Sequence, residues 1–151
     1  MSNEEQYHLG IKALILNKQN QVLILKTNPE ELKGDKTIHW DLPGGRVKKG
    51  DSIETTLRKE VKEELDIDKI EILSHFDSFI SNIRIPVKDY DVGLILFVYK
   101  CKIDENSKIK LSFEHTEYKW ASIEEAKELL SYKYPKSFIE KLDFLLKKQD
   151  I

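Results

Sequence analysis

Residues 92–101 constrain the fold more than any other stretch of this sequence. Side chains of a β-strand alternate between its two faces. Here both alternating sets are apolar, with Val92, Leu94, Leu96 and Val98 on one face and Ile95, Phe97 and Tyr99 on the other. A strand that is apolar on both faces needs cover on both sides. The stretch therefore predicts a β-sheet with helices packed against each of its faces.

Shorter patterns predict further strands and turns. Two apolar runs around a short Asn-rich connection predict a β-hairpin of residues 9–16 and 22–25. Residues 28–41 are polar and contain proline and glycine, which favours a loop. The Pro-Gly-Gly of residues 43–45 predicts a sharp turn, and residues 71–83 are expected to form a strand with a bend.

Residues 52–65 give the clearest helix prediction. Ser52 is a good N-cap, and Glu54 in the first turn interacts favourably with the helix dipole. An apolar side chain recurs every four residues, at Ile53, Leu57, Val61 and Leu65. Asp66 stands where a helix often ends in glycine, and Asp is one of the few other residues that tolerate the left-handed conformation.

Two more helices are predicted at residues 122–130 and 135–147. Ser122, with Glu125 three residues later, has the spacing of a capping box. Strands, a helix in mid-chain, further strands and then helices are typical of an α/β sandwich around a mixed β-sheet. The sequence contains no internal repeat, linker or low-complexity tract, so residues 1–151 are expected to form a single domain.

Composition narrows the class of protein. Hydrophobic residues make up 40% and charged residues 34%, which is typical of a globular chain, and the net charge of -2 gives no electrostatic case for binding a nucleic-acid polymer. Residues 1–8 are polar and no apolar run approaches the ~20 residues of a membrane helix, so neither a secretory signal nor a membrane partner is expected. Cys101 is the only cysteine, which favours a core residue in a reducing compartment. We expect a cytoplasmic monomer or homodimer.

Three glutamates gather near the end of the predicted helix. At roughly 100° per residue, Glu60 and Glu64 lie within ~40° of each other and overlap the apolar stripe, with Glu63 beside them. Carboxylates beside buried surface are costly to desolvate, and like charges at i and i+4 destabilise a helix by roughly 0.2–0.5 kcal/mol. A bound Mg²⁺ or Mn²⁺ would relieve both costs, because these ions prefer oxygen ligands. On spacing alone, a solvated acidic helix end explains the pattern equally well.

The whole stretch resembles the Nudix box, which runs glycine, five residues, glutamate, seven residues, then Arg-Glu-aliphatic-any-Glu-Glu-any-Gly-aliphatic. The resemblance covers residues 45–67 and is carried by Gly45, Glu60, Val61, Glu63, Glu64 and Ile67. Three positions depart from the pattern, with Asp51 for the first glutamate, Lys59 for arginine and Asp66 for the closing glycine. The preceding residues 40–44, Trp-Asp-Leu-Pro-Gly, resemble the family's usual lead-in.

The resemblance implies a Nudix-type α/β/α sandwich as the fold. It implies a MutT-like, metal-dependent nucleotide pyrophosphohydrolase as the activity. Such an enzyme would use Mg²⁺, with Mn²⁺ as a substitute, held by Glu60, Glu63, Glu64 and the backbone carbonyl of Gly44. The catalytic residues would be Glu63, Glu64 and a carboxylate on a later loop. Glu114 is favoured over Glu117 for this last role.

Other roles follow from the same resemblance. Asp51 and Lys59 would pair and brace the helix against the glycine loop, although lysine cannot make the bidentate contact that arginine makes. Lys26, Trp40 and Arg46 are candidates for binding substrate. Lys26 is explained equally well as a surface lysine, and packing under the glycine turn is favoured for Trp40. The histidines, His8, His39, His75 and His115, show no metal-ligand spacing and are interpreted as non-catalytic.

The expected substrate is a small nucleotide of the nucleoside-diphosphate-linked class, by default a nucleoside triphosphate in its native or oxidised form. This choice is made by elimination, because Pro86 and Tyr90 lie further beyond the box than the residues that mark ADP-ribose and dinucleoside-polyphosphate hydrolases. A first alternative is a non-catalytic Nudix-fold nucleotide sensor or partner-binding module, but such relatives usually lose box glutamates. A second is an acidic-helix interaction domain, which leaves the Pro-Gly-Gly turn unexplained.

Overall fold

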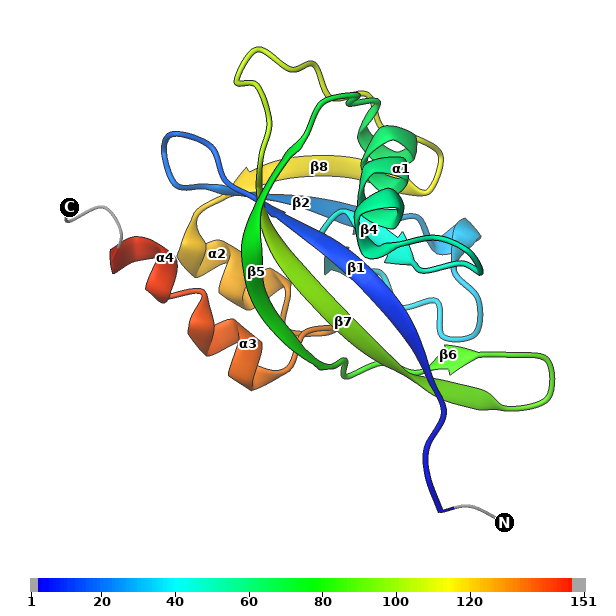
Figure 1. The fold of residues 1–151 in the computed structure, drawn as a ribbon. Coiled ribbons are helices and arrows are strands. Elements are labelled where there is room, and N and C mark those ends of the chain that lie inside the picture. The colour runs from blue at the N-terminus through cyan, green and yellow to red at the C-terminus, as the bar shows by residue number, and fades with distance from the viewer. Residues whose placement is uncertain (1–2, 148–151) are drawn as a thin grey trace.

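The computed structural model describes residues 3–147, which form two β-sheets with helices on both sides (Figure 1). The strands of the first sheet have the order β4-β1-β7-β5, with β6 beside β7. They are β1 (Tyr7–Ile15), β4 (Gly44–Arg46), β5 (Glu71–Ile80), β6 (Ile85–Pro86) and β7 (Asp91–Lys102). β1 and β7 are parallel and the other neighbours in this sheet are antiparallel, so the sheet is mixed, as predicted.

The second sheet is antiparallel and has the order β3-β2-β8. Its strands are β2 (Val22–Thr27), β3 (Trp40–Asp41) and β8 (His115–Ala121). The short helix η1 (Pro29–Glu31) and β3 lie inside the stretch that was predicted to be a loop. The predicted bend in residues 71–83 corresponds to two register irregularities in β5.

The predicted hairpin of residues 9–16 and 22–25 is wrong. The connection does turn, with Asn17 N donating to Gln21 O at 3.1 Å, and a single bridge joins Leu16 to Val22. Beyond that bridge the strands separate, because β1 pairs with β4 and β7 whereas β2 pairs with β3 and β8. Both strands are buried over most of their length, so each needs neighbours and cover that a two-stranded hairpin does not provide.

Helix α1 (Ile53–Leu65) begins and ends where the sequence predicts. Ser52 Oγ accepts a hydrogen bond from Thr55 N at 3.1 Å. Asp66 adopts the left-handed conformation, with φ 59° and ψ 39°, and its N–H donates to the carbonyl of Lys62. These two local devices fix the length of the helix and hence the depth at which its glutamates lie.

The C-terminal helices agree with the prediction in part. Helix α2 (Ile123–Leu129) is capped by Ser122 Oγ, which accepts from Glu125 N at 3.1 Å. The single helix predicted at residues 135–147 is instead two, α3 (Lys136–Lys141) and α4 (Phe144–Lys147). Neither proline nor glycine marks the break at Leu142 and Asp143, so the sequence pattern gave no signal for it.

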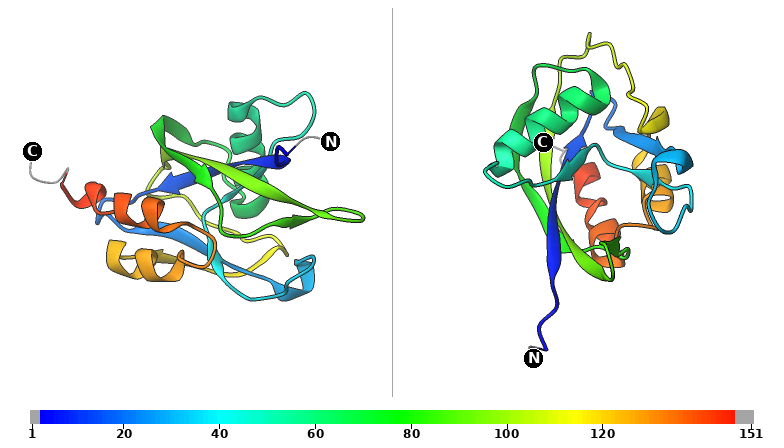
Figure 2. Two further views of the ribbon diagram at one scale, coloured as in Figure 1. Left: turned by 90° about the horizontal axis from the view of Figure 1, so that it is seen from below. Right: turned by 90° about the vertical axis from the view of Figure 1, so that its right-hand side faces the viewer.

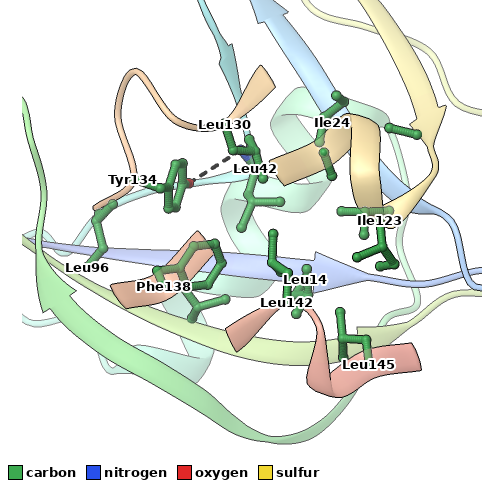
Figure 3. Close-up of a cluster of buried hydrophobic side chains, with 14 of the residues drawn as sticks. Leu14, Ile24, Leu42, Leu96, Ile123, Leu130, Tyr134, Phe138, Leu142 and Leu145 are labelled. Carbon is green, nitrogen blue, oxygen red and sulfur yellow. Dashed lines mark hydrogen bonds between the residues drawn. The ribbon is translucent and has the colours of Figure 1, made fainter. Parts of the chain in front are cut away.

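Helix α1 and helices α2–α4 lie on opposite sides of the sheets (Figure 2), and each side has its own hydrophobic core. On the α2–α4 side the core includes Leu14, Ile24, Leu42, Leu96, Tyr134 and Phe138 (Figure 3). On the α1 side it includes Ile11, Ala13, Leu57, Val61, Leu65 and Cys101. The α/β/α sandwich is confirmed, with its strands divided between two sheets. Among residues 3–147, no helix is long and apolar enough to cross a membrane.

Candidate active site

A cavity of about 840 Å³ lies beside the glycine turn and the inner face of α1. It is lined by the predicted site residues Gly44, Arg46, Glu60, Glu63, Glu64 and Glu114. Residues from both sheets and from the segment between α2 and α3 complete its wall, including Lys12, Asp41, His115, Tyr132 and Lys133. The fold therefore brings together side chains from five separate parts of the chain.

The glycine turn allows backbone to lie directly against the helix glutamates. Gly44 has φ 146°, and a Cβ at this position would overlap the carbonyl oxygen of Ile11. Its N–H donates to Glu64 Oε1 at 2.7 Å. A Cβ at Gly45 would overlap the carboxylate of Glu60. Gly44 is therefore required by its backbone conformation and by its contact with the backbone of β1, whereas a side chain at position 45 would force the Glu60 carboxylate to move.

The helix carboxylates are held where ionisation is costly. Glu64 is 4% exposed, and burial raises its pKa to about 8 although Lys12 and the Gly44 N–H favour the charged form. The pKa of Glu60 is raised to about 7 by burial, by a hydrogen bond with Glu63 and by the charges of Glu63 and Glu114. Protein groups alone therefore leave the negative charge of this cluster poorly compensated.

These residues fit a divalent cation by donor type and by charge. Carboxylate oxygens are the ligands that Mg²⁺ prefers, and their raised pKa values show a deficit of positive charge. Within residues 3–147, no three His, Cys, Asp or Glu side chains converge as a ready-made metal site. Glu60 is turned toward Glu63, whereas Glu64 is bonded to Gly44 N. Of the three glutamates, only Glu60 and Glu63 are therefore in contact with each other.

Asp41 is the centre of a buried charged cluster beneath the cavity. Its Oδ2 accepts from Lys12 Nζ at 3.0 Å and from Lys133 Nζ at 2.5 Å, and its Oδ1 accepts from the Tyr134 hydroxyl at 2.5 Å. Burial alone would raise the pKa of Asp41, but the two ammonium groups hold it far below its usual range. Burial lowers the pKa of Lys133 to about 8, against the attraction of Asp41.

His115 lies beside the glutamates without a hydrogen-bond partner for its Nδ1 atom. This atom is 3.9 Å from Glu64 Oε2, and burial lowers the pKa of the imidazole to about 4. The ring is therefore neutral near pH 7. Its interpretation as non-catalytic rested on sequence spacing, which carries no information about this proximity.

Lys26, Trp40 and Glu117 are not part of the cavity wall. Lys26 and Trp40 are cross-strand neighbours on β2 and β3, and Lys26 Nζ pairs with Glu117 Oε2 at 3.7 Å. Trp40 is partly buried and packs against the α2–α4 core. The geometry gives no support to substrate contact by Lys26 or Trp40, and it favours Glu114 over Glu117 as the later carboxylate.

The predicted brace contact is present. Lys59 Nζ lies 3.1 Å from Asp51 Oδ2, and the Lys59 side chain is 56% exposed. The single contact is what a lysine can make at a position where arginine would form two. It joins the middle of α1 to the loop that follows the glycine turn.

Sequence reasoning missed Lys12, Lys133, Tyr134 and the central role of Asp41. One signal was available, because Lys12 is the only charged residue in the apolar run of residues 9–16. A lysine inside a buried strand requires a partner. No comparable signal marks Lys133 or Tyr134, which reach the site only through the tertiary fold.

A family model described as NUDIX domain matches residues 6–142. The chain is 32% identical over 103 residues to the mouse bis(5'-nucleosyl)-tetraphosphatase (asymmetrical), covering 68% of each protein. It is 24% identical over 144 residues to an RNA pyrophosphohydrolase of Campylobacter jejuni, covering 87% of this chain and 88% of that one. It is 40% identical over 74 residues to Nudix hydrolase 5 of Arabidopsis thaliana, 48% of this chain, but spans only 24% of that protein. The crystal structure of a MutT protein from Methanosarcina mazei superposes with a TM-score of 0.70, at 26% identity, over 99% of this chain and 100% of that one.

Asp41→Asn should destabilise the protein by about 3–5 kcal/mol, because it leaves Lys12 and Lys133 buried without a counter-charge. The folded-state pKa of Asp41 lies below its unfolded value, so the stability that it contributes is present above pH ~4 and is lost as the pH falls below that value. Urea unfolding at pH 7 measures the loss. The matched control is Asp143→Asn, which breaks the partly exposed pair with Lys127 and should cost no more than about 1 kcal/mol. Equal losses in the two variants would contradict the central role of Asp41.

Glu64→Gln should leave the metal-free protein at least as stable as the parent, and more stable at alkaline pH. The folded-state pKa of Glu64, about 8, lies above its unfolded value of 4.5. Stability that is present at pH 4 is therefore lost as the carboxyl ionises between these values, and glutamine removes that loss. Thermal melts in chelator from pH 4 to 9 measure the effect, with the exposed Glu128→Gln as control. A parallel pH dependence in parent and Glu64→Gln would show that Glu64 is not held in a desolvated site.

Proposed function

Since the chain belongs to the Nudix family and is a pyrophosphohydrolase that acts on acid anhydrides, we propose that it cleaves a phosphoanhydride bond of a nucleoside triphosphate, native or oxidised, with the help of Mg²⁺. The observation that carries this proposal is that Glu60, Glu63 and Glu64 all line one large cavity beside the glycine turn, with Glu64 bonded to Gly44 N. Ligand pockets typically measure roughly 300–1,000 Å³. The cavity, at about 840 Å³, has room for a whole nucleotide.

The charges of the cavity suit a polyphosphate and a metal ion together. Its wall carries the basic side chains Lys12, Lys33, Arg46, Lys48, Arg84 and Lys133. In the proposal, Glu60, Glu64 and the Gly44 carbonyl hold the metal, and Glu63 is a further ligand or assists the base. When bound, a divalent ion would neutralise phosphate charge and polarise the attacked phosphorus. The basic residues would bind and orient the rest of the polyphosphate.

Glu114 is proposed as the general base. It lines the cavity, and its charge contributes to the raised pKa of Glu60, so the two carboxylates lie close enough to interact. A carboxylate in the same cavity as the box glutamates can accept a proton from the attacking water. Its backbone carbonyl accepts from Asn28 N at 3.1 Å, which fixes the loop that carries it.

A dinucleoside tetraphosphate is the second candidate substrate. The mouse protein named bis(5'-nucleosyl)-tetraphosphatase supports it, since the alignment covers two thirds of both chains. The exclusion of nucleic-acid polymers stays a prediction from net charge, because one relative carries the name RNA pyrophosphohydrolase. Catalysis is favoured over a purely binding role because all three box glutamates line the cavity.

One assay tests both the reaction and the metal. The purified protein is incubated with dGTP, 8-oxo-dGTP, diadenosine tetraphosphate and 5'-triphosphorylated RNA, with Mg²⁺, Mn²⁺ or excess chelator, and the products are resolved by chromatography. We expect turnover of a nucleoside triphosphate with Mg²⁺ or Mn²⁺ and none in chelator. Full turnover in chelator would refute metal dependence, and exclusive cleavage of diadenosine tetraphosphate or of RNA would replace the proposed substrate.

Lys59→Ala should slow catalysis by about tenfold or more while leaving the melting temperature within a few degrees of the parent. The reason is that Lys59 holds Asp51 and thus the glycine loop, and a displacement of about 1 Å at a site can cost up to ~100-fold in rate. Rates and melts of Lys59→Ala, Asp51→Ala and the double variant form a double-mutant cycle. Lys62→Ala, which breaks the exposed pairs of Lys62 with Asp66 and Asp68, serves as control. Strictly additive losses in rate would count against a direct pair.

A further inference from the structure

We propose that Lys12 is a positioning residue, which clamps the turn of residues 41–44 and thereby fixes the orientation of Gly44 toward Glu64. The proposal concerns a strand residue outside the box. It rests on the proposed function for its effect on rate, but its structural part can be tested without substrate or metal.

The backbone of Lys12 holds one side of the turn. In the antiparallel pairing of β1 with β4, Lys12 is the partner of Gly44. The next residue, Ala13, donates its N–H to the carbonyl of Pro43 at 2.8 Å. Strand β1 thus binds the turn at two successive residues.

The side chain of Lys12 holds the other side of the same turn. Its Nζ donates to Asp41 Oδ2 at 3.0 Å and to the carbonyl oxygen of Leu42 at 3.2 Å. One residue is therefore bonded to Asp41 and Leu42 through its side chain, and is paired with Gly44 through its backbone. Lys12 is only 6% exposed, so these contacts do not compete with bulk water.

The clamp acts on the two backbone groups of Gly44 that matter for the site. The N–H is bonded to Glu64 Oε1, and the carbonyl is the proposed metal ligand. Gly44 has no Cβ and adopts φ 146°, so its own conformational preferences do not fix the orientation of its peptide groups. External bonds must fix them, and those made by Lys12 and Ala13 hold the three residues that lead into Gly44.

The arrangement separates this role from general stability. When Lys12 loses its ammonium group, Asp41 keeps its bonds to Lys133 and Tyr134. The buried Asp41 carboxylate is then still neutralised. What is lost is the hold on the turn, together with the charge of Lys12 that favours the ionised form of Glu64. An ammonium has three N–H donors, two of which are used here, so the competing role is donation of the third to a substrate phosphate.

The test compares Lys12→Met and Lys12→Arg with the parent, using hydrogen exchange of the Gly44 amide followed by NMR in metal-free protein. Lys127→Met, which breaks a partly buried Lys–Asp pair remote from the cavity, is the matched control. We expect exchange at Gly44 to accelerate at least tenfold in Lys12→Met and by an intermediate factor in Lys12→Arg. In Lys127→Met it should not change. In the Mg²⁺-loaded enzyme, kcat of Lys12→Met should fall by about 10- to 100-fold, with KM within about twofold of the parent.

Unchanged Gly44 exchange in a folded Lys12→Met variant would overturn the proposal, whatever its activity. A rise in KM with unchanged kcat and exchange would instead assign Lys12 to phosphate binding.

If Lys12→Met does not fold, Lys12→Arg carries the test, because it keeps the charge that balances Asp41. Parent-like exchange in Lys12→Arg would then refute the clamp. Faster exchange at Gly44 in a protein that hydrolyses no nucleotide would support the clamp and refute the proposed function, so the two can fail separately.

Discussion

A single carboxylate, that of Asp41, connects the parts of this protein that the backbone leaves apart. Asp41 belongs to the three-stranded sheet, Lys12 to the five-stranded sheet, and Lys133 and Tyr134 to the segment that leads into the last helices. Among residues 3–147, one isolated backbone bridge joins the two sheets, between Leu16 and Val22, and apolar side chains of both sheets pack in both cores. The charge that fastens the glycine turn is thus the same charge that ties the sheets and the C-terminal segment together at the floor of the cavity.

Two buried carboxyl groups at the cavity differ in ionisation because their neighbours differ. Asp41 and Glu64 are both buried carboxyls, 5% and 4% exposed. Asp41 has two ammonium partners, and its pKa lies far below the usual value, whereas Glu64 has a backbone N–H and a more distant lysine, and its pKa is about 8. Protein groups alone balance the charge of Asp41. Glu64 still needs a cation or a proton, which is the property expected of a metal ligand and not of a structural residue.

How far the sequence predicts this structure depends on the range of the interactions involved. Helix α1 was predicted from its cap, its apolar spacing and Asp66, all of which act within a few residues. The two apolar faces of residues 92–101 predicted the sandwich, because burial on both sides is a property of the strand itself. The hairpin prediction failed because a short turn does not determine with which strands β1 and β2 continue to pair. The family resemblance located the glutamates, and Lys12 stands out locally as the one charge in an apolar run. Its partners, like Lys133 and His115, are brought to the cavity by long-range packing that no local pattern encodes.

Because the site is assembled from distant segments, its parts are synthesised at different times. A ribosome produces residues 45–67 well before Lys133 and Tyr134, which complete the bonding of Asp41. Until they arrive, the carboxylate of Asp41 lacks two of its three side-chain partners. The box is thus present in the nascent chain well before the turn beneath it can be fully ordered.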